Sequence, residues 1–472
     1  MAVFAIVWLC TILYWRSSGA TPGGGQMLLF LGVLPLGLLA GIWLARRGRA
    51  ARNTAPGTPT ADAGAANTGE DEPAEAQPPL DCLAGAVRLP CGDMAEEVLA
   101  LLPMPPRPGL HPKFRDRDGL PVFAAYVEDL PTDAIADMLA GSTMGGPGGT
   151  VQDERLRALA LLEPVATELF DRLGQLLPPL AVAEERVVAG LRRGGETEVR
   201  QVVRVWALVP AAWEQRLRQA CGDWLLDLAL ASGIDQRRIA LEVSPVTGVE
   251  HTWQLLEGIG SGAIDDAAWH LVLGCDSAIG ERSVQALASS GRLMDSRRIE
   301  GVVPGEAAAG LLLRSASAPA AFEPDAPVAM HRVRRTTLEA GSKLRPAARA
   351  TGELLSRALQ RSATQADAVS LVLTDADQRP SRAAEAGAAV ANACPDIDVA
   401  GECGSLGVAC GEIGHVAPLA LLALAAAQVR ASRQAVLVLS INAEHERFAV
   451  ALAPPLEDAS PGQAGASPEV TT

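Results

Sequence analysis

The residues best suited to act as nucleophiles or metal ligands are cysteines and histidines, and their spacing argues against several kinds of site. The 472-residue chain has eight cysteines and six histidines. No Cys-x-x-Cys pair and no repeated spacing occurs among Cys10, Cys82, Cys91, Cys221, Cys275, Cys394, Cys403 and Cys410. In a chain of this length, such scatter indicates reduced, mostly buried thiols rather than a disulfide framework or a zinc site.

Nucleotides and nucleic acids are also disfavoured as ligands. The Gly-rich stretch at residues 145–149 lacks the Lys of a phosphate-binding loop. The formal net charge of −15 argues against a nucleic-acid binder, because phosphate contacts need a basic surface. The acid pairs Glu96-Glu97 and Asp265-Asp266 stand at expected helix starts, where the helix dipole and solvent explain them. We therefore expect no cofactor, no metal and no nucleic-acid partner.

The elements that would position a site alternate between strands and helices from about residue 81 to residue 453. Apolar runs predict strands at residues 83–89, 120–127, 202–209, 239–243, 270–273, 369–373, 435–441 and 448–453. Helical spacing predicts helices at residues 94–102, 155–177, 212–231, 253–258, 350–361, 381–393 and 416–429. This alternation indicates a layered α/β fold of two lobes, joined by a Pro- and Arg-containing connector at residues 316–349.

The N-terminus differs from the rest in being strongly apolar. Residues 1–15 and 27–44 are two apolar runs, and the second approaches the roughly 20 residues needed to cross a bilayer. We expect residues 1–45 to form a transmembrane hairpin of two short spans, with a single span as the alternative. A cleaved signal peptide fits less well, because no Lys or Arg precedes the first run and a second run follows at once.

Charge predicts the orientation of this anchor. Four arginines follow the second run, and only Arg16 lies between the two runs; the four are Arg46, Arg47, Arg49 and Arg52. The positive-inside rule places everything after them in the cytoplasm, so we expect an inner (cytoplasmic) membrane protein with its globular part in the cytoplasm. Residues 46–80 and 454–472 are poor in large apolar residues and rich in Pro, Ala and acid, which predicts a disordered tether and a disordered tail.

Three stretches resemble β-ketoacyl synthases of the thiolase-like superfamily. They are HLVLGCDSAIGERSVQALASSGRLM from residue 270, the Pro-Gly-Glu strand VVPGEAAAGLLLRSA from residue 302, and GSLGVACGEIGHVAPLALLALAAA from residue 404 with the strands that follow it. The resemblance implies a thiolase-like two-lobed layered fold. Its N-terminal lobe would span residues 81–315 and its C-terminal lobe residues 350–453, with a five-stranded sheet in each and the active site where the lobes join.

A condensing enzyme of this family needs a Cys at a tight turn that opens a buried helix, where the helix N-terminus lowers the thiol pKa. The resemblance places that turn at residues 243–250 (VSPVTGVE), which contain no Cys. Ser244 and Thr247 are the only nucleophiles there. The nearest thiol downstream, Cys275, is expected at a strand end and is interpreted as a buried small residue. These three remain weak catalytic candidates.

The family also uses two histidines, or a histidine and an asparagine. Where the first is expected, residues 374–379 read TDADQR and contain no His. The second allows two registers. One sets Gly407 on the family Gly and puts Val408 in the His position; the other uses the Ile-Gly-His triplet that ends at His415. His251 and His445 are isolated, and each is interpreted as a surface or capping residue.

The missing residues predict a membrane-anchored, catalytically degenerate β-ketoacyl synthase-like protein that acts as a scaffold or partner-binding subunit. The family implies a homodimer or a heterodimer with a related chain, and an acyl carrier protein or an envelope or secretion component as a further partner. The alternative is an acyltransferase or carrier-protein-handling condensing enzyme with an altered site built on Cys275, Ser244, Thr247 or His415.

Overall fold

The computed structural model describes residues 78–141, 153–177, 186–188, 191–193, 202–264, 267–315 and 327–455. The expected transmembrane hairpin, most of the expected tether, nearly all of the expected tail and Cys10 lie outside the described residues. So do the Gly-rich stretch at residues 145–149 and the pair Asp265-Asp266.

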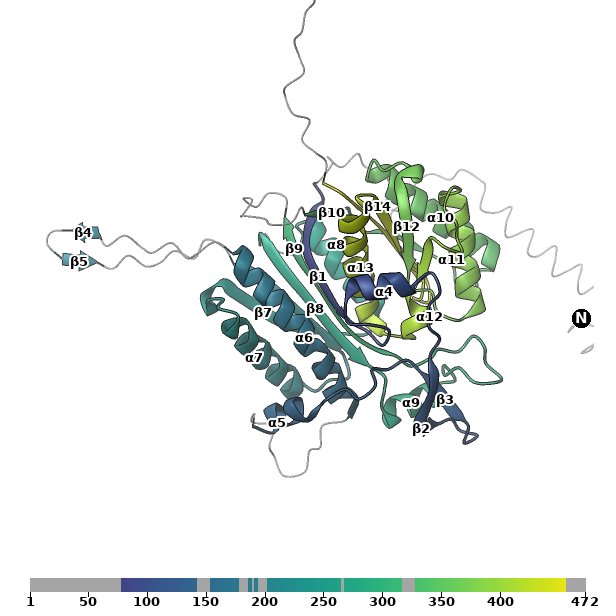
Figure 1. The fold of residues 1–472 in the computed structure, drawn as a ribbon, viewed down its shortest axis with the longest axis horizontal. Coiled ribbons are helices and arrows are strands. Elements are labelled where there is room, and N and C mark those ends of the chain that lie inside the picture. Colours follow the sequence, from purple (N-terminus) through teal and green to yellow (C-terminus); the bar gives the residue numbers. More distant parts are fainter. Residues whose placement is uncertain are drawn as a thin grey trace, which may run out of the picture. The chain divides into compact units, whose positions relative to one another are not determined.

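One mixed sheet of 11 strands runs through the folded part (Figure 1). Its N-terminal half has, in order, β7 (Ile239–Val246), β6 (Val203–Pro210), β8 (Trp269–Ser277), β9 (Glu306–Ser315) and β1 (Leu80–Arg88). Its C-terminal half has β13 (Cys403–Ser405), β12 (Val369–Thr374), β14 (Ala435–Ser440), β15 (Glu446–Ala453) and β10 (Val328–Met330), with β11 (Arg334–Thr337) also paired to β15. Strands β7, β6 and β8 are parallel, and β9 runs antiparallel to both of its neighbours.

The two halves meet at β1, which pairs with β9 on one side and with β10 on the other. Separate sheets were expected for the two lobes, but the short ladder from Leu80↔Met330 to Cys82↔Val328 makes the sheet continuous. Both β10 and β11 belong to the segment expected to be a connector. Each has only three or four residues, too few to produce a readable apolar pattern.

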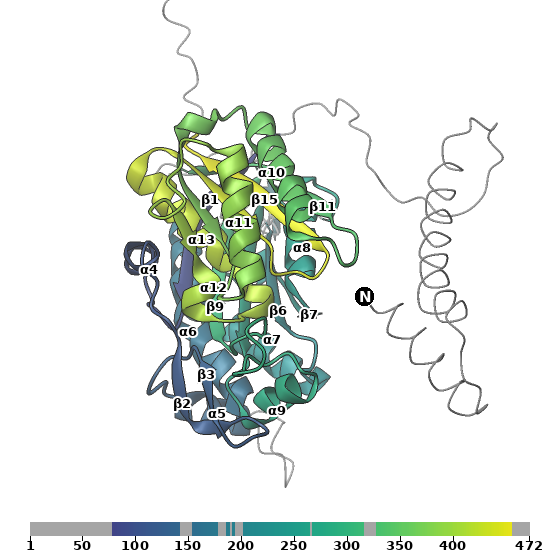
Figure 2. The ribbon, with the colours of Figure 1, turned by 90° about the vertical axis from the view of Figure 1, so that its right-hand side faces the viewer.

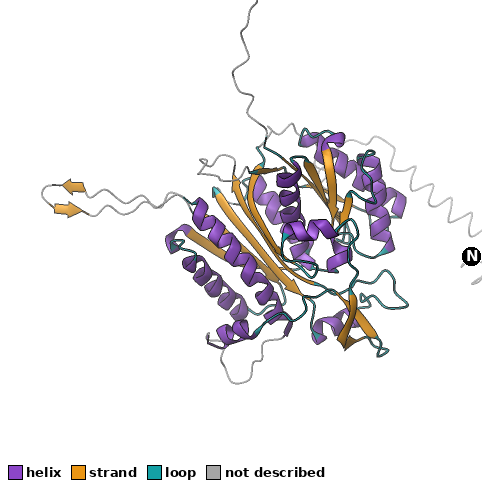
Figure 3. Ribbon diagram, viewed as in Figure 1, coloured by secondary structure: helices purple, strands orange, loops and turns teal. Residues whose placement is uncertain are grey.

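Helices cover both outer faces of the sheet and fill the space between its halves (Figures 2 and 3). The N-terminal half is covered by α6 (Asp153–Leu176) and α7 (Gln215–Ala231), and the C-terminal half by α10 (Leu344–Arg361) and α11 (Pro380–Ala393). Between the halves lie α8 (Val249–Gly260) and α13 (Ala417–Ser432). Each of the three spaces holds its own buried apolar cluster. The layered α/β architecture is therefore confirmed.

Helix α13 is buried on nearly all sides because its Ala- and Leu-rich sequence lets both sheet halves approach closely. At Gly85 of β1, an added β-carbon would come within 2.8 Å of the β-carbon of Ala423. Among the described residues, one stretch is long and apolar enough to cross a membrane by length and composition. It is Gly414–Ser432, which contains this helix, and 72% of it is buried inside the protein.

Smaller elements complete the described fold. They are α4 (Ala95–Leu101), the hairpin of β2 (Gly109–Arg115) and β3 (Pro121–Ala124), α5 (Asp133–Gly141), β4 (Arg186–Val188), β5 (Leu191–Arg193), α9 (Glu281–Ser289), α12 (Leu406–Cys410) and the short 3₁₀ turns η2 (Gln236–Arg238), η3 (Ala366–Ala368) and η4 (Gly414–Val416).

Candidate functional site

A small cavity lies between the lobes, where α8, α12 and α13 begin near the ends of β7 and β12. It is lined by Val249, Asp375, Leu406, Gly407, Gly411, Glu412, Ile413, Gly414, Ala417 and Asn442. Its volume is about 10 Å³, which is about the least that holds one water molecule. The place where the family resemblance puts an active site therefore has no room for an acyl chain.

The first feature of this cavity is the start of α8. Strand β7 ends at Val246, Gly248 adopts an extended conformation, and the helix begins at Val249. A thiol at a helix start would be activated by the partial positive charge of the free backbone N–H groups. This chain has Val249 there, an apolar side chain only 6% exposed that belongs to the central apolar cluster.

The hydroxyl candidates lie beside this helix start but do not line the cavity. Ser244 is half-buried on β7, and its hydroxyl donates to Glu242 Oε1 over 3.0 Å. Thr247 is exposed, and its Oγ1 lies 3.2 Å from Nδ1 of the exposed His251. A nucleophilic hydroxyl needs a base that is itself held by a third group, and no such third contact to His251 is present among the described residues.

Cys275 faces away from the cavity. Along β8 the side chains of Leu271, Leu273 and Cys275 point into the outer cluster under α6 and α7, whereas Val272 points to the central cluster. The thiol is fully buried, and burial raises its pKa well above the ordinary value. A reactive Cys needs the opposite environment, exposed and electropositive.

The second feature is a buried carboxylate at the end of β12, in the segment that the resemblance equates with the first catalytic His. Asp375 is 2% exposed and accepts hydrogen bonds from Ser440 Oγ at 2.6 Å and from the Ile441 amide at 2.7 Å. Its backbone oxygen accepts from Asn442 Nδ2 at 2.5 Å. Burial raises the pKa of the Asp375 carboxyl, and these hydrogen bonds partly oppose that rise.

Two further charged groups adjoin Asp375. Asp377 is buried and binds Arg379 Nε through both carboxylate oxygens at 2.8 Å, and Arg379 Nη2 donates to Asn442 Oδ1 at 3.0 Å. Burial raises the pKa of Glu412, whose backbone hydrogen bonds with residues 303 and 305 at the start of β9. Sequence reasoning found the TDADQR segment but missed Glu412, which contacts the other lobe, and Asn442, which contacts Asp375 and Arg379. Contacts between such distant segments leave no local pattern.

The third feature is the close approach of α12 to the end of β12. A β-carbon on Gly407 would collide with the backbone oxygens of Asp375 and Ala376, so only Gly fits there. Val408, next along the chain, is half-buried. Gly414 lines the same cavity with φ of 55°, and a β-carbon there would collide with Asp276 Oδ2. Both glycines of the two alternative registers therefore lie at the lobe junction.

His415 is buried beneath the cavity, against the ends of the N-terminal strands. Its Nε2 lies 3.2 Å from the Leu208 backbone oxygen, and its Nδ1 lies 3.6 Å from Asp276 Oδ2. Burial lowers the pKa of His415 to about 4 and raises the pKa of Asp276 to about 7. Thr252 Oγ1 on α8 donates to the His415 backbone oxygen at 2.8 Å. These contacts fix the imidazole among the core elements.

Within the part of the chain that the structure describes, no three His, Cys, Asp or Glu side chains are arranged to hold a metal. The described cysteines are all free thiols. Sulfur atoms of Cys91 and Cys410 lie 3.6 Å apart, close to the start of β9. The lining of the inter-lobe cavity thus combines two carboxyl groups, an amide and apolar side chains, without a nucleophile at the helix start.

No protein-family model and no curated protein matches the sequence. Solved structures do match the fold. An oxazolomycin ketosynthase domain from Streptomyces albus JA3453 superposes with a TM-score of 0.50 at 13% identity, over 83% of this chain and 76% of its own. The PfaC ketosynthase–chain length factor superposes with a TM-score of 0.50 at 12% identity, over 80% of this chain and 43% of its own. A type II polyketide synthase acyl carrier protein in complex with its ketosynthase gives a TM-score of 0.45 at 11% identity, over 80% of this chain and 100% of its own.

The first two of these matches show that the chain has the thiolase-like fold of β-ketoacyl synthases. The prediction made from the three sequence stretches is confirmed at the level of the fold.

Proposed function

We propose that this chain is a non-catalytic member of the ketosynthase fold that serves as a partner-binding subunit at a membrane. The observation that carries the proposal is Val249, which occupies the helix start where a condensing enzyme needs its thiol. Asp375 at the end of β12 and a cavity of about 10 Å³ support it further. In the ionised form that accepts hydrogen bonds from Ser440 and Ile441, Asp375 has no hydrogen to donate to an enolate oxygen, whereas an imidazole can supply one.

The free edge of the sheet is consistent with the binding of a partner chain. Strand β7 ends the strand order, so its outer backbone edge is not paired with any described strand. A groove of about 530 Å³ runs beside it, lined by apolar residues of β7 (Ile239, Leu241 and Val243) and by one face of α7. Exposed edges of this kind accept a further strand. The partner is a second copy or a related chain, as in the ketosynthase–chain length factor that shares the fold.

Membrane attachment rests on the two apolar runs and the Arg cluster after them. Protease applied to the outside of spheroplasts should leave the folded part intact. Digestion from the outside would overturn the cytoplasmic orientation.

The test of the catalytic claim is incubation of the full-length chain with acylated and malonylated carrier protein, followed by mass spectrometry. We expect no covalent acyl adduct and no condensation product. Loss of one oxyanion donor alone costs about 10²–10³ in rate, and loss of the nucleophile removes the covalent path. An active ketosynthase in the same assay serves as the positive control.

An adduct would favour the alternative, an acyltransferase with an altered site. An adduct on Thr247, whose hydroxyl contacts His251, should be absent from Thr247→Val. An adduct on Cys275 should be absent from Cys275→Ala. Either result would overturn the non-catalytic proposal.

A further inference from the structure

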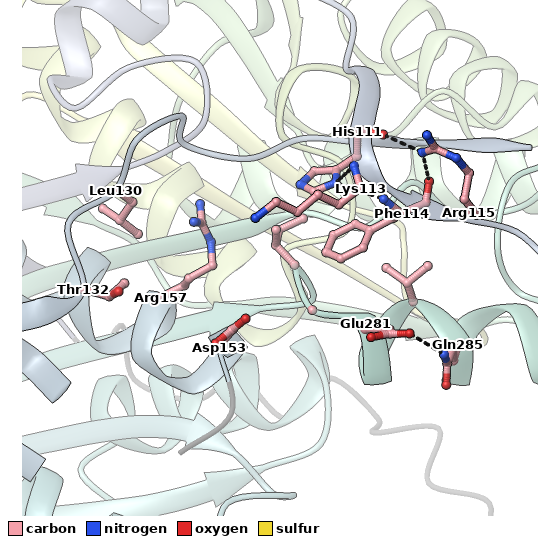
Figure 4. Close-up of a pocket in the computed structure, with 13 residues that line it drawn as sticks. His111, Lys113, Phe114, Arg115, Leu130, Thr132, Asp153, Arg157, Glu281 and Gln285 are labelled. Carbon is pink, nitrogen blue, oxygen red and sulfur yellow. Dashed lines mark hydrogen bonds between the residues drawn. The ribbon is translucent and has the colours of Figure 1, made fainter. Parts of the chain in front are cut away.

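A second and much larger cavity lies at one end of the N-terminal lobe, away from the inter-lobe cavity. Strand β2, the start of α6 and the start of α9 surround it (Figure 4). Its volume is about 700 Å³, within the range of small-molecule sites. None of its lining residues lines the inter-lobe cavity, and the proposed function gives it no role.

His111 is the most enclosed polar group of this cavity, only 8% exposed. Its ring stacks on Phe114 with centroids 3.9 Å apart and meets Tyr126 edge-on at 4.7 Å. Its Nδ1 accepts hydrogen bonds from the backbone amides of Lys113 at 3.2 Å and Phe114 at 3.3 Å. Two donors on Nδ1 require the neutral tautomer with its hydrogen on Nε2. His111 therefore presents a fixed N–H donor.

The neutral state of His111 is also favoured electrostatically. Burial lowers its pKa most, and the positive charges of Arg157 and Lys113 lower it further, while Glu306 acts weakly in the opposite sense. The ring therefore stays an uncharged donor at neutral pH, and the positive charge of the wall comes from the neighbouring cations.

Arg157 is held rigidly at the same wall by a carboxylate behind it. Its Nε donates to Glu306 Oε2 at 2.8 Å, and its Nη2 donates to Glu306 Oε1 at 2.5 Å and to the Val127 oxygen at 2.7 Å. Glu306 is fully buried and also accepts from Ser277 Oγ and the Val127 amide. Arg157 and Glu306 neutralise each other. The guanidinium of Arg115, which also lines the cavity, donates to the backbone oxygens of Pro112 at 3.0 Å and Phe114 at 2.9 Å. Lys113 is the lining cation left for a ligand, because its ammonium group forms no ion pair with a described residue.

Acidic and apolar side chains complete the lining. Figure 4 shows Asp153 beside Arg157, both near the start of α6, and Glu281 of α9 across the cavity from His111 and Lys113. These carboxylates disfavour a ligand with more than one negative charge. The apolar side chains are Phe114, which stacks on His111, and Leu130, Ile279 and Val284, and they offer contact area for a short hydrocarbon body. The lining thus combines the donor and cation of β2 with nearby apolar area.

We propose that this cavity binds a small organic monocarboxylate. Its carboxylate accepts a hydrogen bond from His111 Nε2 and pairs with the ammonium group of Lys113. Its apolar body lies against Phe114 and Val284. Such charge-assisted hydrogen bonds are the strong ones, and here they form at a wall whose imidazole and guanidinium are already fixed.

The chain offers an internal control, because its only two lysines are Lys113 and Lys343. Lys343 precedes α10 in the other lobe and is exposed. The full-length chain is treated with an amine-acetylating reagent, with and without hexanoate, and the acetylated peptides are quantified. At ten times its Kd, hexanoate should slow acetylation of Lys113 about tenfold and leave Lys343 unchanged. Equal rates for Lys113 with and without hexanoate at any attainable concentration would overturn the proposal.

Calorimetric titration of hexanoate into variants tests the contacts. Lys113→Met should weaken binding about tenfold or more, and the matched variant Lys343→Met should bind as the parent does. His111→Phe keeps the ring stack and removes the donor, so it should also weaken binding. Unchanged affinity in Lys113→Met would contradict the assignment. Inorganic phosphate should not protect Lys113; protection by phosphate equal to that by hexanoate would exclude a site selective for monocarboxylates.

Discussion

The buried His415 and the half-buried Asp276 beside it have opposing effects on stability. The folded-state pKa of His415, about 4, lies below its ordinary 6.5, so its contribution to stability is lost as pH falls from 6.5 to about 4. The folded-state pKa of Asp276, about 7, lies above its ordinary 3.8, so its contribution is lost as pH rises from 3.8 to about 7. Between pH 4 and 6.5 the two largely cancel.

Removing either group should reveal the pH dependence of stability that the other group contributes. Relative to the parent protein, Asp276→Asn should gain about 3 kcal/mol in the free energy of unfolding from pH 4 to pH 6.5, because it lacks the carboxyl whose raised pKa lowers stability over that interval. Relative to the parent, His415→Gln should lose a similar amount over the same interval, on the order of 3 kcal/mol. Urea unfolding at a series of pH values measures both slopes, with the parent protein as the reference. Variant slopes that both lie above, or both lie below, the parent slope would contradict this account.

The candidate site was only partly predictable at the residue scale. The absence of Cys at residues 243–250 and of His at residues 374–379 could be seen directly in the sequence. The direction of Cys275 could not, because β8 is buried on both faces and an apolar run without alternation does not reveal which side chains point inward. His111, Arg157 and Glu306 meet at one wall of the second cavity from three distant segments, so no local spacing indicates that cavity.

At the scale of elements, α13 and β1 lie so close together that one added methyl group between them should lower the stability of the fold. Gly85→Ala places a β-carbon 2.8 Å from that of Ala423, and overpacking of this kind costs about 1–3 kcal/mol. We expect Gly85→Ala to lower the free energy of unfolding by that amount and Ala423→Gly to restore part of it in the double variant.

Gly109→Ala is the matched control, since a β-carbon there meets nothing within 4 Å. Chemical denaturation of the three variants measures the differences. A loss in Gly109→Ala as large as that in Gly85→Ala would show that the effect is not one of packing.

The sequence predicted most of the long helices and strands, but it did not predict the short ones. The expected strand at residues 202–209 is β6, and the expected helix at residues 155–177 is α6, each within two residues. Strand β10 could not be predicted, because its three residues acquire their conformation from partners in β1 and β15. The polar strand β2, with most of its residues exposed, also lacks the apolar signal of a strand.

At the scale of the whole molecule, β7 is the edge through which we expect the chain to pair. Leu241→Lys places a charge on the half-buried outer part of this strand, and charged edges resist pairing. Native mass spectrometry of the full-length chain, released from detergent micelles, should show a dimer for the parent and mainly monomer for Leu241→Lys. Ile299→Lys, at a residue 65% exposed in a loop, should remain dimeric. A parent protein that stays monomeric at micromolar concentration would leave only a different, related chain as the partner.

The position of β1 between β9 and β10 also determines when the protein can fold during synthesis. The strand emerges early from the ribosome, but its pairing partners end at Ser315 and Met330. At about 5–20 residues per second, β1 waits roughly 10–50 s with both edges unpaired. Throughout that time its apolar side chains need shielding by a chaperone or by the nascent chain itself. Slower translation between residues 90 and 330 should therefore lower the yield of folded protein more than slower translation after residue 330.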